Sequence, residues 1–177
     1  MRGPEMKFLT LIRHAKSSHD NPSLTDVQRI LNARGLRDAP AMGWYLREHW
    51  QFRPDLMISS HAVRAIHTAR LIAAEIGYDE PRIRLEPRIY EAPVSSLLQV
   101  VREQADETRH LCLTGHNPGT EQFTQFLCGG PAVHDVVTCA IIMLELPIER
   151  WKDTGSGCAV LRHNVFPAAI GLGKHLD

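Results

Sequence analysis

The chain has 177 residues, a length that suits one domain with a complete hydrophobic core. Lysine plus arginine and aspartate plus glutamate balance at 20 each, which argues against a nucleic-acid-binding protein, although a neutral total can still contain a local basic pocket. No apolar stretch is long enough to span a membrane, and the N-terminal MRGPEM lacks the apolar segment of a signal peptide, so we expect a cytoplasmic protein that binds no membrane.

The cysteines and histidines do not indicate a metal site. Four cysteines stand at positions 112, 128, 139 and 158 and form no C-x-x-C pair, so we expect buried, reduced thiols. The ten histidines include no H-E-x-x-H motif and no closely spaced His/Cys set. We therefore expect neither a metal ion nor another cofactor.

The first half of the chain alternates strands and helices. The continuous apolar run at 7–12 predicts a buried strand, and the polar stretch 15–32 predicts a loop. Helices are expected at 33–50, despite a proline and a glycine in the middle, and at 62–76, which Gly77 ends. A second short strand is expected at 55–59. Residues 1–5 are expected to form a loose extension.

The second half continues this pattern and ends in two strands. Residues 79–93 are extended and punctuated by prolines. The patterns predict helices at 94–106 and 117–127, with Asn117 as the cap of the second, and strands at 110–114, 136–146 and 158–165. The last two strands have no helix between them and should pair like a hairpin. The order predicts one domain over 1–177, a three-layer α/β sandwich whose mostly parallel sheet has an antiparallel edge strand.

Three of the predicted strands are followed by charged side chains at their carboxyl ends. Arg13 and His14 follow the first strand, Arg64 lies one helical turn beyond the second, and His116 follows the strand at 110–114. Ligands of open parallel sheets bind at the carboxyl ends of the strands, so we expect these four side chains to gather at one edge. Two other Arg-His pairs in the chain fail this test, because they enter a strand or lie inside one.

Taken singly, each of these residues has a plain structural explanation. His14 and His116 could cap an element or pack in the core, and Arg64 could be a solvated helix residue. Together they form a cluster of cations that would repel one another without an anion, and phosphate is the usual dianion at such sites. Two arginines can hold phosphoryl oxygens, a neutral imidazole can attack phosphorus, and a second histidine can stabilise the transferring group. This chemistry needs no metal.

A carboxylate should donate a proton to the leaving group and later activate water. Glu91, in the stretch RIYEAP, is the best candidate because it follows a short extended segment. The alternative is a loop carboxylate that simply faces water.

Five motifs occur in order over nearly the whole chain: LIRHAKSS, LNARGLRDAPAMG, SSHAVRAIHTA, YEA and TGHNPGTE. In these residues the chain resembles the histidine phosphatase superfamily and, more narrowly, the SixA-like phosphohistidine phosphatases. The resemblance implies a phosphoglycerate mutase-like fold and His14 as the phosphorylated nucleophile. It also implies Arg13, Arg64 and His116 as the phosphate pocket, and it places Glu91 where many members keep their acid/base group.

Residues next to these motifs are further candidates. Lys16, Ser17 and Asn117 adjoin the pocket and could contact phosphate or substrate. Two positions depart from the family pattern, since His61 stands where a proline often follows serine, and Ile30 also replaces a common proline. Both changes affect loop geometry rather than the charged set, and His61 adds an imidazole near the site.

The short chain leaves no stretch for a large lid, and an open site suits a phosphoryl group on a protein surface. We therefore expect a metal-independent phosphatase that forms a covalent phosphohistidine intermediate and dephosphorylates phosphohistidine on a protein partner. The alternative is a small-molecule phosphomonoesterase with the same pocket, in which the P–O ester would need Glu91 more. A non-catalytic phosphate- or phosphoprotein-binding module is the third possibility, although all four pocket residues are present.

Overall fold

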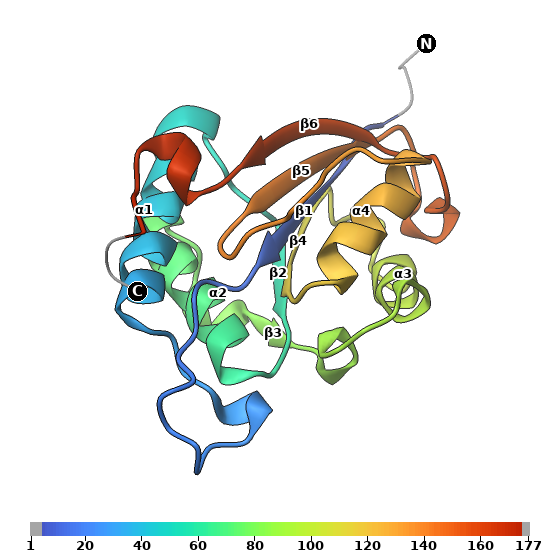
Figure 1. Cartoon of the computed structure of the whole chain (residues 1–177). Helices are drawn as coiled ribbons and strands as arrows, with labels where there is room; N and C mark the ends of the chain where they lie inside the picture. Colours follow the sequence, from blue (N-terminus) through green and yellow to red (C-terminus); the bar gives the residue numbers. More distant parts are fainter. Residues whose placement is uncertain (1–4, 175–177) are drawn as a thin grey trace.

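A computed structural model describes residues 5–174, which form one six-stranded sheet with helices on both faces (Figure 1). The strands, in their order across the sheet, are β3 (Arg84–Leu85), β2 (Leu56–Ser59), β4 (His110–Gly115), β1 (Lys7–Arg13), β5 (Ile141–Leu146) and β6 (Val160–Val165). The helices are α1 (Ala33–Trp50), α2 (Val63–Ile76), α3 (Val94–Arg102) and α4 (Gly119–Cys128). Helices α1 and α2 cover one face and α3 and α4 the other, which confirms the predicted three-layer α/β sandwich.

Strand β1 lies in the middle of the sheet, where the strand directions change. It is parallel to β4, from the pair Phe8 and His110 to the pair Arg13 and Gly115, and antiparallel to β5. Strands β2 and β3 continue the parallel part, and β6 pairs antiparallel with β5. The predicted antiparallel side and the hairpin-like pairing of the last two strands are therefore confirmed. A short 3₁₀ helix, Trp151–Asp153, lies between them where no helix was expected.

The side chains of β1 point alternately to the two faces of the sheet and pack into two hydrophobic cores. Leu9 and Leu11 pack with α3 and α4, whereas Ile12 packs with α1 and α2. Burial on both faces explains why this strand reads as a continuous apolar run. Arg13 and His14 are thus attached to a strand that is buried on both faces of the sheet.

Helix α1 runs without interruption through Pro40 and Gly43. A Cβ at Gly43 would lie 2.9 Å from the Cβ of Glu75 and 3.1 Å from the Cα of Ile72, so the glycine permits close packing of α1 on α2. The packing gain outweighs the helix propensity that glycine lowers.

Two predicted strand starts are wrong. The strand expected from residue 136 begins at Ile141, because residues 136–140 form a loop. Cys139 has a φ of 62°, and its backbone N–H donates to the carbonyls of both Arg13 and His14 at the end of β1, outside the regular ladder that starts at Ile141. The last strand begins at Val160 rather than at residue 158.

Two helix boundaries differ from the prediction by two residues or more. Helix α3 ends at Arg102, and Asp106 beyond it accepts hydrogen bonds from the ammonium group of Lys7 and, at 2.9 Å, from the backbone N–H of Trp151. Helix α4 begins two residues after Asn117, whose side-chain oxygen still accepts from the backbone N–H of Glu121 at 3.3 Å. At the end of α3, tertiary contacts therefore override the local pattern.

The loops and termini contain further departures. The polar stretch 15–32 includes a 3₁₀ helix, Asp26–Gln28, and the proline-punctuated stretch 79–93 includes two more. Two of the four cysteines are buried and two are half-buried, and none forms a disulfide. Of the expected N-terminal extension, residues 1–4 lie outside the described residues, and Glu5 is exposed and pairs with Arg109. Between residues 5 and 174, no helix is long and apolar enough to cross a membrane.

Candidate active site

The four predicted residues meet in one pocket at the carboxyl ends of β1, β2 and β4. This pocket has a volume of about 220 Å³. Its lining residues are basic or polar: Arg13, His14, Lys16, Ser17, His19, Arg29, Arg64, His116, Asn117 and Thr138. Parallel strands that are neighbours in the sheet end at the same edge, so side chains distant in sequence converge there.

The ring of His14 is held with one nitrogen free to react. Its Nδ1–H donates to the carbonyl of Ala15 at 2.7 Å, so Nε2 carries the lone pair. Arg64 Nε lies 3.4 Å from this Nε2 and donates to it. Burial, together with the charges of His116, Arg64 and Arg13, lowers the pKa of His14 to about 3. The imidazole is therefore neutral at physiological pH, which is the form that can attack phosphorus.

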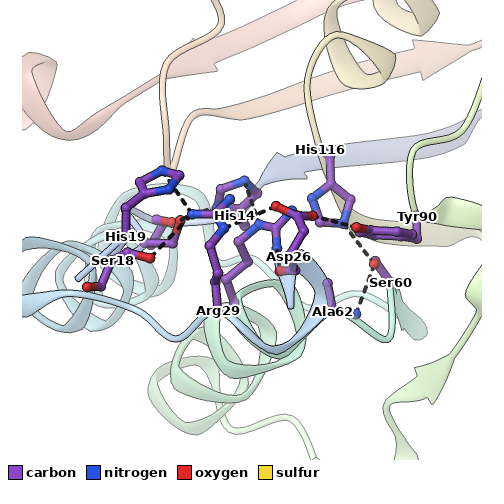
Figure 2. A network of polar contacts seen from close by, with 12 residues as sticks. His14, Ser18, His19, Asp26, Arg29, Ser60, Ala62, Tyr90 and His116 are labelled. Atoms are coloured by element: carbon purple, nitrogen blue, oxygen red, sulfur yellow. Dashed lines mark hydrogen bonds and ion pairs between the residues drawn. The ribbon is translucent and has the colours of Figure 1, made fainter. Parts of the chain in front are cut away.

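Arg64 is positioned by Asp26, a residue that the sequence pattern did not single out and that Figure 2 shows bonded to Tyr90. Arg64 Nη2 donates to the Asp26 carboxylate at 3.0 Å, and Nη1 donates to the Asp26 backbone carbonyl at 2.6 Å. Asp26 also accepts from Arg29 Nε at 3.1 Å and from the Tyr90 hydroxyl. One carboxylate thus holds two arginines of the pocket.

The charge state of Asp26 follows from these partners. The hydrogen bond from the Tyr90 hydroxyl, with those from Arg29 and Arg64, lowers the pKa of Asp26 well below its usual range. The carboxylate is therefore ionised at neutral pH, and it orients cations rather than donating a proton.

His116 faces His14 across the pocket, with ring centroids 5.2 Å apart. Its Nε2 lies 2.8 Å from the hydroxyl of Ser60, which accepts from the backbone N–H of Ala62 and can donate its own proton to the ring. The buried Nδ1 has no hydrogen-bond partner among the described residues. Burial, with a contribution from the charge of Arg64, lowers the pKa of His116 to about 4.

Comparisons with known proteins identify the family of the chain. The family description "Histidine phosphatase superfamily (branch 1)" matches residues 9–130, more than half of the chain. The chain belongs to this superfamily. An uncharacterised protein of Mycobacterium tuberculosis is 29% identical over 159 residues, which cover 85% of this chain and 96% of the relative.

Solved structures share the fold of this histidine phosphatase. The protein histidine phosphatase SixA in complex with tungstate has a TM-score of 0.78 and 17% identity, over 92% of this chain and 99% of that one. A protein of Agrobacterium tumefaciens, provisionally named phosphohistidine phosphatase SixA, has a TM-score of 0.77 and 24% identity, over 91% and 98%. These likenesses confirm the SixA-like, phosphoglycerate mutase-like fold that the motifs implied.

Three further candidates from the sequence also line the pocket: Lys16, Ser17 and Asn117. Lys16 and Ser17 follow His14, and the Ser17 hydroxyl accepts from Arg29 Nη1 at 2.6 Å. Helix α1 approaches this segment so closely that a Cβ at Gly35 would lie 2.2 Å from the carbonyl oxygen of Lys16. Asn117 donates from Nδ2 to the carbonyl of Val136 at 2.8 Å. The start of α1 therefore holds the segment that carries Lys16 and Ser17 against the site.

Arg13 is tied to the loop in front of β5. Its Nη1 donates to the carbonyl of Val136 at 2.8 Å, while its buried Nε makes no hydrogen bond within residues 5–174. Arg13 also lines the pocket, where its guanidinium group can contact a phosphoryl oxygen. Desolvation lowers the pKa of this arginine, which remains a cation at physiological pH.

Glu91 is not among the pocket-lining residues. It is exposed, has a φ of 49°, and directly follows Tyr90, whose ring packs edge-on against His116 at 5.4 Å. His61 is also exposed and packs against the other side of Tyr90 at 5.5 Å. The acid/base role of Glu91 stays a prediction.

Several functional contacts have no signal in the sequence. Asp26 and Arg64 are 38 positions apart, and the loop that carries Asp26 has no periodic pattern to place it. Ser60 could have been noticed because it precedes the departure at His61, but its bond to His116 could not. Within residues 5–174, no group of three or more His, Cys, Asp or Glu side chains is arranged to hold a metal ion.

Proposed function

We propose that this histidine phosphatase removes the phosphoryl group from a phosphohistidine on a protein, through a covalent intermediate on His14. The observation that carries the proposal is the make-up of the pocket wall. Its described residues include four fixed cations and three imidazoles, and no carboxylate. Such a wall suits a dianionic group whose leaving group needs little help from an acid.

The first step follows from the two ring nitrogens of His14. Nε2 attacks phosphorus, the new P–N bond forms, and the bond to the leaving imidazole breaks as that ring takes up a proton from water. The carbonyl of Ala15 holds the Nδ1–H throughout and stabilises the ring as it becomes positive. Arg13 and Arg64 contact the phosphoryl oxygens, and His116 stabilises the charge that develops.

In the second step, water attacks the phosphoryl group on His14. The P–N bond breaks, inorganic phosphate leaves, and the neutral imidazole is restored. The arginines supply the charge neutralisation that a metal ion provides in other phosphoryl-transfer sites, so we propose that no metal takes part. The SixA structure with tungstate, a tetrahedral oxyanion like phosphate, supports an oxyanion pocket in this fold.

A small-molecule phosphomonoesterase is the second candidate. The observation that favours it is Glu91, which lies beside Tyr90 near the mouth of the site and could supply a proton to an alkoxide leaving group after a local rearrangement. The exposed position of Glu91 makes it the weaker of the two candidates. In either case the partner carries a phosphoryl group, and we retain the cytoplasmic location as a prediction from the sequence.

The test is a side-by-side assay of purified protein on a phosphohistidine-containing protein and a panel of small phosphate esters. We expect higher kcat/KM on phosphohistidine, no activity in His14→Ala on any substrate, and unchanged activity after treatment with EDTA. Turnover by His14→Ala would refute the covalent mechanism. Strict metal dependence would refute the metal-free pocket, and a clear preference for one ester would favour the second candidate.

A further inference from the structure

The loop in front of β5, residues 134–139, is bound directly to the catalytic residues. The backbone N–H of Cys139 donates to the carbonyls of Arg13 and His14 at 3.1 and 3.0 Å. The carbonyl of Val136 accepts from Arg13 Nη1 and from Asn117 Nδ2 at 2.8 Å each. These bonds hold the loop in one position relative to His14, and Thr138 is its one residue that lines the phosphate pocket.

This loop turns one apolar side chain outward. Val133 and Val136 are 2% and 4% exposed, whereas Val137 is 41% exposed. A single exposed valine needs no explanation on its own. This one, however, stands between two hollows and next to Thr138, which lines the phosphate pocket.

The two hollows lie on either side of Val137, and both Val137 and Phe166 line each of them. Each has a volume of about 260 Å³. The first is lined by residues of the loop, the start of α1 and the C-terminal segment: Arg34, Asp38, Val137, Thr138, Phe166, Pro167, Ala168, Leu172, Gly173 and Lys174. The second is lined by His134, Asp135, Val136, Val137, Ala140, Asn164 and Phe166. We refer to Val137, Thr138, Phe166, Pro167 and Leu172 together as the Val137 surface.

We propose that the Val137 surface docks the polypeptide segment next to the phosphohistidine of the substrate protein. The proposal rests on the proposed function and adds a binding site for the chain that carries the phosphoryl group. Its main support is continuity, because Thr138 belongs both to the phosphate pocket and to the first hollow. A segment attached to a phosphoryl group in the pocket must leave over one of its walls, and this wall offers apolar contacts.

The size of the hollows favours a polypeptide over a small ligand. Pockets that enclose a drug-sized molecule have about 300–1,000 Å³, and each hollow here is smaller than that. Two hollows on either side of one apolar residue suit side chains of an extended segment.

The charged residues that line the hollows indicate which side chains the docked segment carries. The first hollow contains the exposed Lys174, and its carboxylate, Asp38, is 2% exposed and accepts from Arg37 at 2.6 Å. The net field there is positive, as it is in the neighbouring phosphate pocket. The second hollow contains the exposed Asp135 and has no such bias. We therefore infer a segment with one apolar side chain against Val137 and an acidic side chain toward Lys174.

The test compares two substrates that share the same scissile P–N bond. One is free phosphohistidine, and the other is a synthetic peptide with a single phosphohistidine flanked by leucine and glutamate. Val137→Glu places a charge between the two hollows. Val160→Glu is the matched control, because Val160 is 48% exposed on β6 and lines neither the hollows nor the phosphate pocket.

For Val137→Glu we expect kcat/KM on the peptide to fall about tenfold, through KM, because an apolar contact is replaced by a charge. Its kcat/KM on free phosphohistidine should stay unchanged, and Val160→Glu should match the wild type on both substrates. Equal losses on both substrates, or no loss on the peptide, would overturn the docking site. Val137→Ala repeats the test with a variant that removes the contact without adding charge.

The same assay separates this inference from the proposed function. If the wild type hydrolyses neither phosphohistidine substrate but does hydrolyse esters, the proposed function fails and the docking site fails with it. If the wild type hydrolyses free phosphohistidine and the peptide with equal kcat/KM, the function stands and the docking site is refuted.

Discussion

Replacement of Asp26 by asparagine tests whether the carboxylate positions the arginines of the pocket. The variant keeps the backbone carbonyl that accepts from Arg64 Nη1, and it loses the charge that pairs with Nη2 at 3.0 Å. The side chain of Arg64 is 6% exposed, but that of Asp26 is 48% exposed, so solvent screens the pair. We therefore assign the pair about 1–2 kcal/mol rather than the 3–5 kcal/mol lost when a fully buried pair is broken.

This free energy corresponds to a change in kcat/KM. If Arg64 reaches its full contact with phosphate only when Asp26 orients it, then kcat/KM should fall about 5- to 30-fold in Asp26→Asn. Tyr90 provides a second test, because its hydroxyl donates to the same carboxylate. Tyr90→Phe should cost less, and the double variant should lose less than the sum of the two single variants, because both changes act through one carboxylate.

The assay is steady-state kinetics on free phosphohistidine, with the thermal midpoint of each variant measured in parallel. A midpoint that stays well above the assay temperature, together with reduced kcat/KM, separates positioning from loss of the fold. A kcat/KM for Asp26→Asn within twofold of the wild type, or strictly additive losses in the double variant, would refute the reasoning.

Two further predictions concern protonation. Burial lowers the pKa of His110 to about 4, while the unfolded chain titrates near 6.5, so the free energy of unfolding should fall as the pH drops below about 6.5. Urea unfolding measures the decrease in the free energy of unfolding between pH 6.5 and pH 5. This decrease should be smaller by about 2 kcal/mol in His110→Gln than in the wild type, and equal decreases in the two proteins would contradict the assigned burial effect. Glu91→Gln should slow the hydrolysis of phosphate esters more than that of phosphohistidine, and equal slowing would remove the leaving-group argument.

The convergence of Arg13, His14, Arg64 and His116 could be predicted because it depends only on strand order and direction. Strands β1, β2 and β4 are parallel neighbours, so the residues that follow them meet whatever the details of the loops. The hydrophobic pattern of a strand is encoded locally, and the position of its carboxyl end follows from the topology.

Contacts that depend on loop conformation could not be predicted. Val136 and Val137 read as the start of a strand, but the backbone of this region bonds to the end of β1 instead. Likewise, Asp26 lies in a polar stretch that looks like an unremarkable loop until its 3₁₀ turn meets Arg64 and Tyr90. In both cases the backbone conformation is set by residues distant in sequence, which no local propensity encodes.

The reversal of chain direction at β5 has a consequence for redesign. Because β5 runs antiparallel to β1, its beginning lies beside the end of β1, and the segment between α4 and β5 reaches the proposed phosphate pocket without contributing any of its four proposed reacting or phosphate-holding side chains. His134, Asp135 and Val137 are exposed in this segment, whereas Val136 and Cys139 bond to Arg13 and to the end of β1. Substitutions at the three exposed positions are therefore the natural way to redirect this scaffold toward new phosphorylated targets while those bonds stay in place.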